Sequence, residues 1–250
     1  MNKIPSIFSS EIQFITDDQM KKVDQLMINK YKITLLQMME NASLQLARLS
    51  RVIFPNKKKF LVLVGKGNNG GGGLGAARRL HSWGFEVAVL LACKRNEFKL
   101  IPKKQLEIID NLDIEITESE DEFQKIFDNY SNDGVVIDAL LGYSLKGNPR
   151  EAYATLIRLA NNSRLPIISL DIPSGVEGTK GEIISPAIKA NATLTLALPK
   201  TGFLNRDVKQ NIGRLFVADI SVPPMLYSDL GLKVQKTLFQ KGSILEIKEK

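Results

Sequence analysis

Three polar stretches, each directly after a short apolar run, hold the residues of this chain best suited to chemistry. The glycine-rich stretch GKGNNGGGG follows residues 60–64, Asp138 follows residues 135–137, and Asp171 follows residues 166–170. Glycines let a ligand approach the backbone, and a glycine turn that opens a helix directs free N–H groups at an anion. Two carboxylates at the mouth of one pocket suit cation binding or proton transfer.

Each stretch also has a structural interpretation. Residues 65–70 satisfy G-x-G-x-x-G between a predicted strand and a predicted helix, a context that favours an anion or nucleotide role over a flexible turn. No Lys-Ser or Lys-Thr follows the glycines, which excludes a P-loop. A strand-end aspartate can simply cap the next turn. Because Asp138 and Asp171 would both face the glycine stretch, we expect them to act at one crevice, with Ser174 presented toward the same space.

A nicotinamide dehydrogenase of the Rossmann type stays open as an alternative. Its fingerprint calls for an acidic residue about 20 positions after the glycines, and this chain has Cys93, Lys94 and Arg95 at the end of the next strand instead. The two cations could receive a 2′-phosphate, which would suit an NADP-binding oxidoreductase. Cys93 is expected to be a buried structural thiol. His81, the only histidine, lies near a helix end and is expected to serve the helix dipole rather than catalysis.

Strand and helix patterns alternate along most of the chain. Capping boxes at residues 16–19 and 34–37 predict two N-terminal helices, whose methionines are expected to be core. Short apolar runs then alternate with helical stretches, which predicts an α/β fold: a Rossmann-like three-layer α/β/α sandwich with a mostly parallel sheet. The predicted strands are residues 60–64, 87–92, 135–137, 166–170, 193–198 and 215–218, with a weaker edge strand at 114–116. Further helices are predicted at 103–112, 121–130 and 150–161.

Composition narrows the class of protein. With 250 residues and 44% hydrophobic content, residues 1–250 are expected to form one domain. The single cysteine excludes a disulfide framework, and no apolar run is typical of a signal peptide or a membrane span, so a cytoplasmic location is expected. The formal charge is +7, but the basic runs lack interleaved aromatics, so nucleic acid is not the expected partner. The C-terminal KGSILEIKEK supports no prediction.

Five segments, in order, resemble those of the NAD(P)H-hydrate epimerases, also called the YjeF N-terminal domain. They are LLQMMENA, GKGNNGGGGLGAARRL, VIDALLG, SLDIPSGVEG and TLTLALPKTG, within a match from about residue 16 to 224. The resemblance implies interconversion of the R and S forms of hydrated NADH and NADPH at C6 of the reduced nicotinamide ring. It also implies a separate dehydratase that acts downstream on the S form. A fused dehydratase domain is expected to be absent, because 250 residues leave no room for it.

The resemblance also implies a site. A potassium ion would be held by Asn69, Asp138 and Ser174, and Asp171 would be the general acid/base. Lys200 is expected to add a phosphate contact, and a homodimer through the N-terminal helices is expected. The implied substrate-binding residues are Asp171 and two stretches: Asn68, Asn69, Gly70, Gly71 and Gly72, then Gly142, Tyr143, Ser144, Leu145, Lys146, Gly147 and Asn148.

The chain departs from the family pattern at two places. Gly72 stands where the family loop usually has aspartate, and Tyr143 and Ser144 stand where a threonine and a glycine are frequent. Loss of a carboxylate from the glycine stretch would either lessen repulsion of an anionic substrate or weaken turnover. Together with the positive charge, it favours a second interpretation, a non-catalytic binding or scaffold module with an RNA or protein partner.

Overall fold

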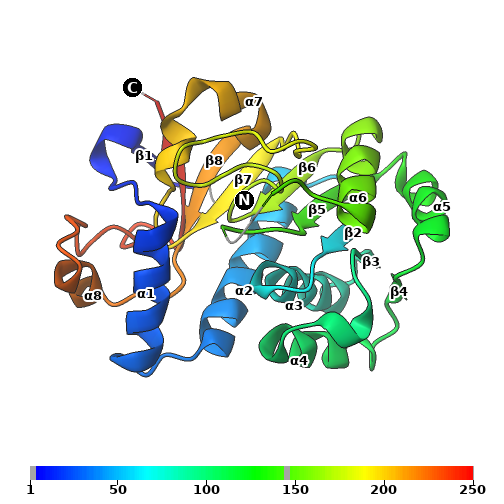
Figure 1. Ribbon diagram of the computed structural model, residues 1–250, viewed down its shortest axis with the longest axis horizontal. Helices are drawn as coiled ribbons and strands as arrows, with labels where there is room; N and C mark the ends of the chain where they lie inside the picture. The colour runs from blue at the N-terminus through cyan, green and yellow to red at the C-terminus, as the bar shows by residue number, and fades with distance from the viewer. Residues whose placement is uncertain (1–3, 144–146, 250) are drawn as a thin grey trace.

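A nine-stranded sheet organises the part of the chain that the computed structural model describes, residues 4–143 and 147–249. The strand order is β1-β9-β8-β7-β6-β5-β2-β3-β4, and every neighbouring pair is parallel except β8 and β9. Figure 1 shows the sheet crossing the molecule between its helices. The strands are β1 Ser6–Phe8, β2 Lys59–Val64, β3 Glu86–Leu91, β4 Glu115–Thr117, β5 Gly134–Ala139, β6 Ile167–Leu170, β7 Ala192–Leu196, β8 Arg214–Ala218 and β9 Ile244–Lys248.

Helices cover both faces of the sheet, which confirms the three-layer sandwich. Apolar side chains of α2, α3 and α4 pack on one face, and those of α5 and α6 pack on the other. Helix α1 packs with α2, α8 and the far end of the sheet in a separate cluster. The helices are α1 Asp17–Asn29, α2 Leu35–Ile53, α3 Asn68–Ser82, α4 Leu100–Ile109, α5 Glu120–Tyr130, α6 Glu151–Asn162, α7 Lys209–Ile212 and α8 Pro224–Asp229.

The local signals that predicted these elements are visible in the structure. In α1 the hydroxyl of Thr16 accepts from the N–H of Gln19, and in α2 the hydroxyl of Thr34 accepts from the N–H of Gln37. Strand β2 sends alternate side chains, such as Leu61 and Val62, into the two different cores, which explains its unbroken apolar run. Six predicted strands correspond to β2, β3, β5, β6, β7 and β8, and the weak run at 114–116 is the edge strand β4.

Two strands escaped prediction. The C-terminal segment that supported no prediction forms β9, which is antiparallel to β8 and parallel to β1 at the N-terminus. Leu245 of β9 is buried in the cluster around α1. Both partners of β9 are chosen by the tertiary fold, so the short ILEIK pattern by itself carried too little information. The described residues contain no helix long and apolar enough to cross a membrane.

Candidate functional site

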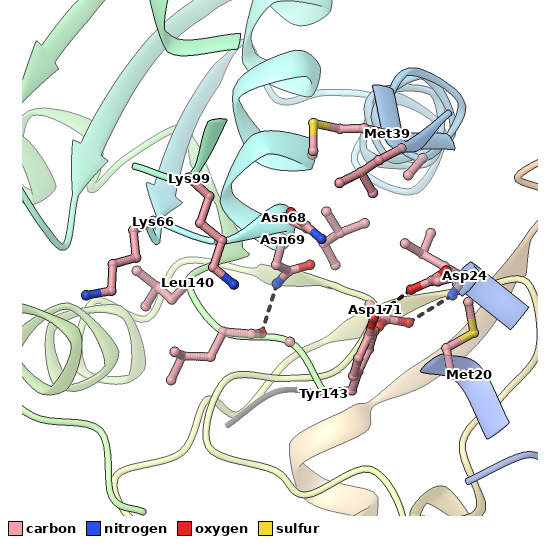
Figure 2. A pocket seen from close by; sticks show the side chains of 18 of the residues that line it. Met20, Asp24, Met39, Lys66, Asn68, Asn69, Lys99, Leu140, Tyr143 and Asp171 are labelled. Atoms are coloured by element: carbon pink, nitrogen blue, oxygen red, sulfur yellow. Dashed lines mark hydrogen bonds between the residues drawn. The ribbon is translucent and has the colours of Figure 1, made fainter. Parts of the chain in front are cut away.

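A pocket of about 650 Å³ opens where β2, β5, β6 and β7 reach their carboxyl ends. This is the edge of a parallel sheet at which ligands bind. Helices α1 and α2 supply part of its wall, and the start of α3 supplies another part (Figure 2). Met20, Met38 and Met39, expected to be core only, are buried but also line the pocket. Other lining residues include Asp24, Lys66, Asn68, Asn69, Gly72, Lys99, Gly142, Tyr143, Asn148, Arg150, Leu170 and Asp171.

Asp171 lies directly after β6 in a strained turn. Its φ of 65° falls in the left-handed region, and the N–H of Ile172 donates to the carbonyl of Leu170 at 2.9 Å, which closes a γ-turn around it. Oδ1 of Asp171 accepts from Lys200 Nζ at 2.5 Å and from the backbone N–H of Leu196 at 3.1 Å. Among the described residues no donor reaches Oδ2 within hydrogen-bond distance, so this second oxygen is available to a ligand in the pocket that Asp171 lines.

Lys200 does not contact the pocket, and its expected role in phosphate binding is wrong. Its side chain is completely buried, and its ammonium group donates to Asp171, to the hydroxyl of Thr195 and to the carbonyls of Leu196 and Leu198. The carbonyls of Leu196 and Leu198 flank Ala197, whose φ of 63° makes a second γ-turn. The sequence placed Lys200 after a strand end, but the direction of its side chain depends on this turn.

Asp24 is a second carboxyl group in the pocket, and the sequence did not single it out. It projects from the middle of α1, and its Oδ2 accepts from the Tyr143 hydroxyl at 2.6 Å. Burial raises the pKa of Asp24, the hydrogen bond from Tyr143 opposes that shift, and the charge of Asp171 adds to it. An isolated aspartate on an amphipathic helix gives no local signal, because its exposure depends on what covers the helix.

Asp138 is not in the pocket, contrary to the expectation that it would face the same crevice as Asp171. It is completely buried, and its carboxylate accepts four hydrogen bonds, which fill its acceptor sites. The donors are the N–H and hydroxyl of Ser174, the hydroxyl of Ser169 and the N–H of Leu140. Burial raises the pKa of Asp138, and these donors act in the opposite direction.

The three residues expected to hold potassium belong to one hydrogen-bonded chain. Asn69 donates from Nδ2 to the carbonyl of Leu141 at 2.9 Å, and the N–H of Leu141 donates to the Ser174 hydroxyl, which bonds Asp138. Of the three, Asn69 alone lines the pocket. Because its nitrogen is engaged, its amide oxygen lies on the pocket side, as Figure 2 shows.

The glycine stretch serves close packing more than loop flexibility. Helix α3 begins at Asn68, so Gly70 and Gly73 lie inside its first turns. A Cβ at Gly70 would lie 1.7 Å from the carbonyl oxygen of Gly65, and one at Gly73 would lie 2.5 Å from Cβ of Ala139. The start of α3 is therefore pressed against the ends of β2 and β5. Asn68, Asn69 and Gly72 line the pocket, whereas Gly70 and Gly71 do not.

The space beside Gly72 explains the departure from the family loop. A Cβ at this position would lie 2.6 Å from Cδ2 of Leu170, a buried side chain of the core. An aspartate at position 72 therefore has no room unless Leu170 moves. The carbonyl of Gly72 accepts from the hydroxyl of Ser43 on α2, which ties α3 to α2 at the same level.

The structure divides the remaining predicted residues. Gly142, Tyr143 and Asn148 line the pocket and Gly147 does not, while Ser144, Leu145 and Lys146 lie outside the described residues. The lining cations are Lys66, Lys99 and Arg150. Lys94 and Arg95 do not line it, and Arg95 pairs with Asp110, so they offer no 2′-phosphate site there. His81 lies in the last turn of α3. Cys93 is half-buried, and burial raises the pKa of its thiol to about 11.

Comparisons with known proteins agree with this arrangement. The family model described as YjeF-related protein N-terminus matches residues 35–202. The chain is 36% identical over 236 residues to an NAD(P)H-hydrate epimerase of Dehalogenimonas lykanthroporepellens, covering 93% of this chain and 92% of the relative. It is 34% identical over 207 residues to the protein of that name from Limosilactobacillus fermentum, covering 83% of this chain and 96% of the relative.

Two further matches extend the comparison. The bifunctional NAD(P)H-hydrate repair enzyme Nnr of Thermofilum pendens is 34% identical over 218 residues, which cover 87% of this chain and 42% of that protein. The crystal structure of yeast ynu0, YNL200c, superimposes with a TM-score of 0.79 at 23% identity, covering 94% of this chain and all of that one. This last likeness shows the fold.

Proposed function

The chain belongs to the YjeF-related protein N-terminus family, and on that basis we propose that it is an NAD(P)H-hydrate epimerase. The reaction is interconversion of the R and S forms of hydrated NADH and NADPH at C6 of the reduced nicotinamide ring. Two relatives named as such epimerases match nearly their whole length. The observation that carries the proposal is the geometry of Asp171, which has one oxygen fixed by Lys200 and the other open to the pocket.

The chemistry of C6 calls for a positioned proton acceptor or donor. This carbon bears both the ring nitrogen and a hydroxyl group, so it is a hemiaminal, and reversible ring opening or loss of hydroxide would scramble its configuration. Both routes move a proton at the hydroxyl oxygen. Asp171 can do this from Oδ2, because Lys200 balances its negative charge and the γ-turn fixes the direction of its side chain.

The charges around the pocket support one orientation of the substrate. The lining cations Lys66, Lys99 and Arg150 and the first N–H groups of α3 suit the diphosphate. The carboxyl groups of Asp24 and Asp171 belong to the other end. The nicotinamide end of the substrate would then lie against Asp171 and the diphosphate against the start of α3.

Potassium is the proposed cofactor, and the donor set suits it. Asn69, Asp138 and Ser174 supply amide, carboxylate and hydroxyl oxygens, the ligand type that hard cations prefer, and the hydrogen bonds above join all three. The ion would add positive charge beside the start of α3. In the described structure the carboxylate of Asp138 is saturated by protein donors, so a bound ion would replace one of them.

The dehydratase partner, a homodimer and a cytoplasmic location complete the proposal. The bifunctional repair enzymes among the relatives support a dehydratase that works with this activity, here as a separate protein. The dimer through α1 and α2 stays a prediction, and light scattering after size exclusion would test it.

One assay tests the proposed activity. Purified protein is incubated with R-enriched hydrated NADPH and an S-specific dehydratase, and recovery of NADPH is followed. We expect recovery to be faster than spontaneous epimerisation allows, and Asp171→Ala to remove the acceleration. Absence of acceleration by the wild-type chain would contradict the proposal. Tight, salt-dependent RNA binding would then favour the scaffold, and hydride exchange with a carbonyl compound would favour the oxidoreductase.

A further inference from the structure

The R and S substrates carry their C6 hydroxyl on opposite faces of the ring, so this inference, which rests on the proposed function, concerns a second proton-transfer group. By microscopic reversibility, the group that assists departure from one face in one direction assists addition to that face in the other. We propose that Asp24 is this second catalytic residue and that it serves one face of the ring while Asp171 serves the other.

The first support is placement. Asp24 and Asp171 both line the pocket, and they come from unrelated elements, α1 and the end of β6. Helix α1 lies outside the sandwich formed by α2 to α6, and it reaches the pocket with Asp24 and Met20. Figure 2 shows Asp24 and Asp171 at the same end of the pocket. A ring bound at that end therefore meets two carboxyl groups.

The second support is the difference between the two environments. Asp171 is bonded to the buried ammonium group of Lys200, which favours the carboxylate and so the role of base. Asp24 has no cation bonded to it in the described structure, and its partner is the neutral hydroxyl of Tyr143. Two carboxyl groups whose surroundings favour opposite protonation states are a typical acid and base pair.

The groups that act on Asp24 come from several elements. Burial raises its pKa most strongly, Asp171 from the end of β6 raises it further, and Tyr143 after β5 and Lys200 after β7 lower it. The net direction is upward, which favours the neutral acid. Burial and the neighbouring carboxylate also raise the pKa of the Tyr143 hydroxyl, so Tyr143 stays a donor and acts as a positioning residue.

The proton balance of the step is complete. Asp24 donates a proton to the C6 hydroxyl, the C6–O bond breaks, and the lone pair of the ring nitrogen forms an N1=C6 double bond as water leaves. Water then adds to C6 from the other face, and its proton passes to Oδ2 of Asp171. The ring returns to its neutral hydrated form with inverted configuration. Asp24 regains a proton from solvent and Asp171 loses one, and the reverse reaction exchanges the two roles.

The test compares Asp24→Asn, Tyr143→Phe and wild type by chromatographic separation of the two epimers from pH 5 to pH 10. We expect Asp24→Asn to lower kcat by about 10² to 10⁴-fold, the usual contribution of general acid catalysis. Wild type should lose kcat/KM at high pH as Asp24 ionises. Tyr143→Phe removes a donor to the ionised carboxylate, so it should move that loss to higher pH. Asp18→Asn, an exposed aspartate of the same helix paired with Lys21, is the matched control and should behave as wild type.

The outcomes separate this inference from the proposed function. A wild-type chain that does not accelerate epimerisation refutes both. An active wild type with Asp24→Asn within threefold of it refutes the role of Asp24 alone. If Asp24→Asn loses activity by unfolding, which its thermal melt would reveal, Tyr143→Phe decides: an unchanged high-pH limb overturns the role of Asp24, and a limb shifted upward supports it.

Discussion

The ammonium nitrogen of Lys200 lies 2.5 Å from Oδ1 of Asp171, and neither side chain is appreciably exposed. The pair joins the ends of two neighbouring parallel strands, β6 and β7. A charge as buried as that of Lys200 is tolerated because it is paired and hydrogen-bonded. The same pairing leaves Oδ2 of Asp171 for the substrate, so one contact both stabilises the fold and orients the candidate catalytic oxygen.

Lys200→Met should destabilise the protein by about 3–5 kcal/mol, because it leaves the buried carboxylate of Asp171 unpaired. The double variant with Asp171→Asn should recover part of this loss, since the unpaired charge is then gone. Urea unfolding measures both. Lys30→Met, which breaks an exposed pair with Asp229, should leave the transition unchanged. Equal loss in the single and double variants would contradict the coupling.

Asp17→Asn should stabilise the protein at neutral pH. Burial and the charge of Glu177 raise the pKa of Asp17 to about 6, and its Oδ1 has no partner among the described residues. A carboxyl whose pKa is raised in the folded state loses stability as pH rises from about 4 to about 6. The gain in free energy of unfolding should be on the order of 2 kcal/mol at pH 7.5 and vanish near pH 4.

Thermal melts at the two pH values check this prediction. Asp18→Asn provides the contrast, because the ion pair with Lys21 lowers the pKa of Asp18. This variant should not stabilise the protein at either pH. An equal gain at pH 4 and pH 7.5 for Asp17→Asn would mean that ionisation of Asp17 is not the cause.

Gly72→Asp, which restores the residue usual in the family, should destabilise this chain by about 1–3 kcal/mol through overpacking against Leu170. It should also lower activity, because Leu170 precedes Asp171 and lines the pocket. In a Leu170→Ala background the cost of Gly72→Asp should be smaller, and a double-mutant cycle measures the difference. Gly67→Ser, where no atom lies within 4 Å of an added Cβ, should be tolerated. Additive effects would exclude the clash.

Replacing potassium with tetramethylammonium should lower both epimerase activity and the melting temperature of the wild-type chain. Asn69→Ala removes one oxygen donor at the pocket and should abolish the response of both quantities to potassium. Titration of potassium chloride at constant ionic strength measures this. A wild-type response that tetramethylammonium reproduces would reflect ionic strength and argue against the site.

Leu245→Ala in β9 should cost about 2–5 kcal/mol, because the side chain is buried in the cluster that includes α1. Met225→Ala, at an exposed apolar residue of α8, should have little effect. Denaturant unfolding compares them. A small loss for Leu245→Ala would mean that β9 is not a structural member of the sheet.

The sequence alone determined the elements and the end of the sheet at which the site lies. Capping boxes at Thr16 and Thr34 act between residues three apart, and unbroken apolar runs report strands buried on both faces, so both can be interpreted locally. Asp171 was identifiable because a residue that follows a parallel strand must lie at its carboxyl end.

Only the tertiary structure decided which polar groups meet there. Tyr143 bonds Asp24 across 119 residues, and Lys200 bonds Asp171 across 29, so neither pair leaves a local pattern. Asp138 looked equivalent to Asp171, yet the turn containing Ser174 covers one and leaves the other at the pocket. Propensity, capping and periodicity arise from neighbours in sequence, whereas burial, charge pairing and the direction of a side chain arise from segments that become neighbours only when the chain folds.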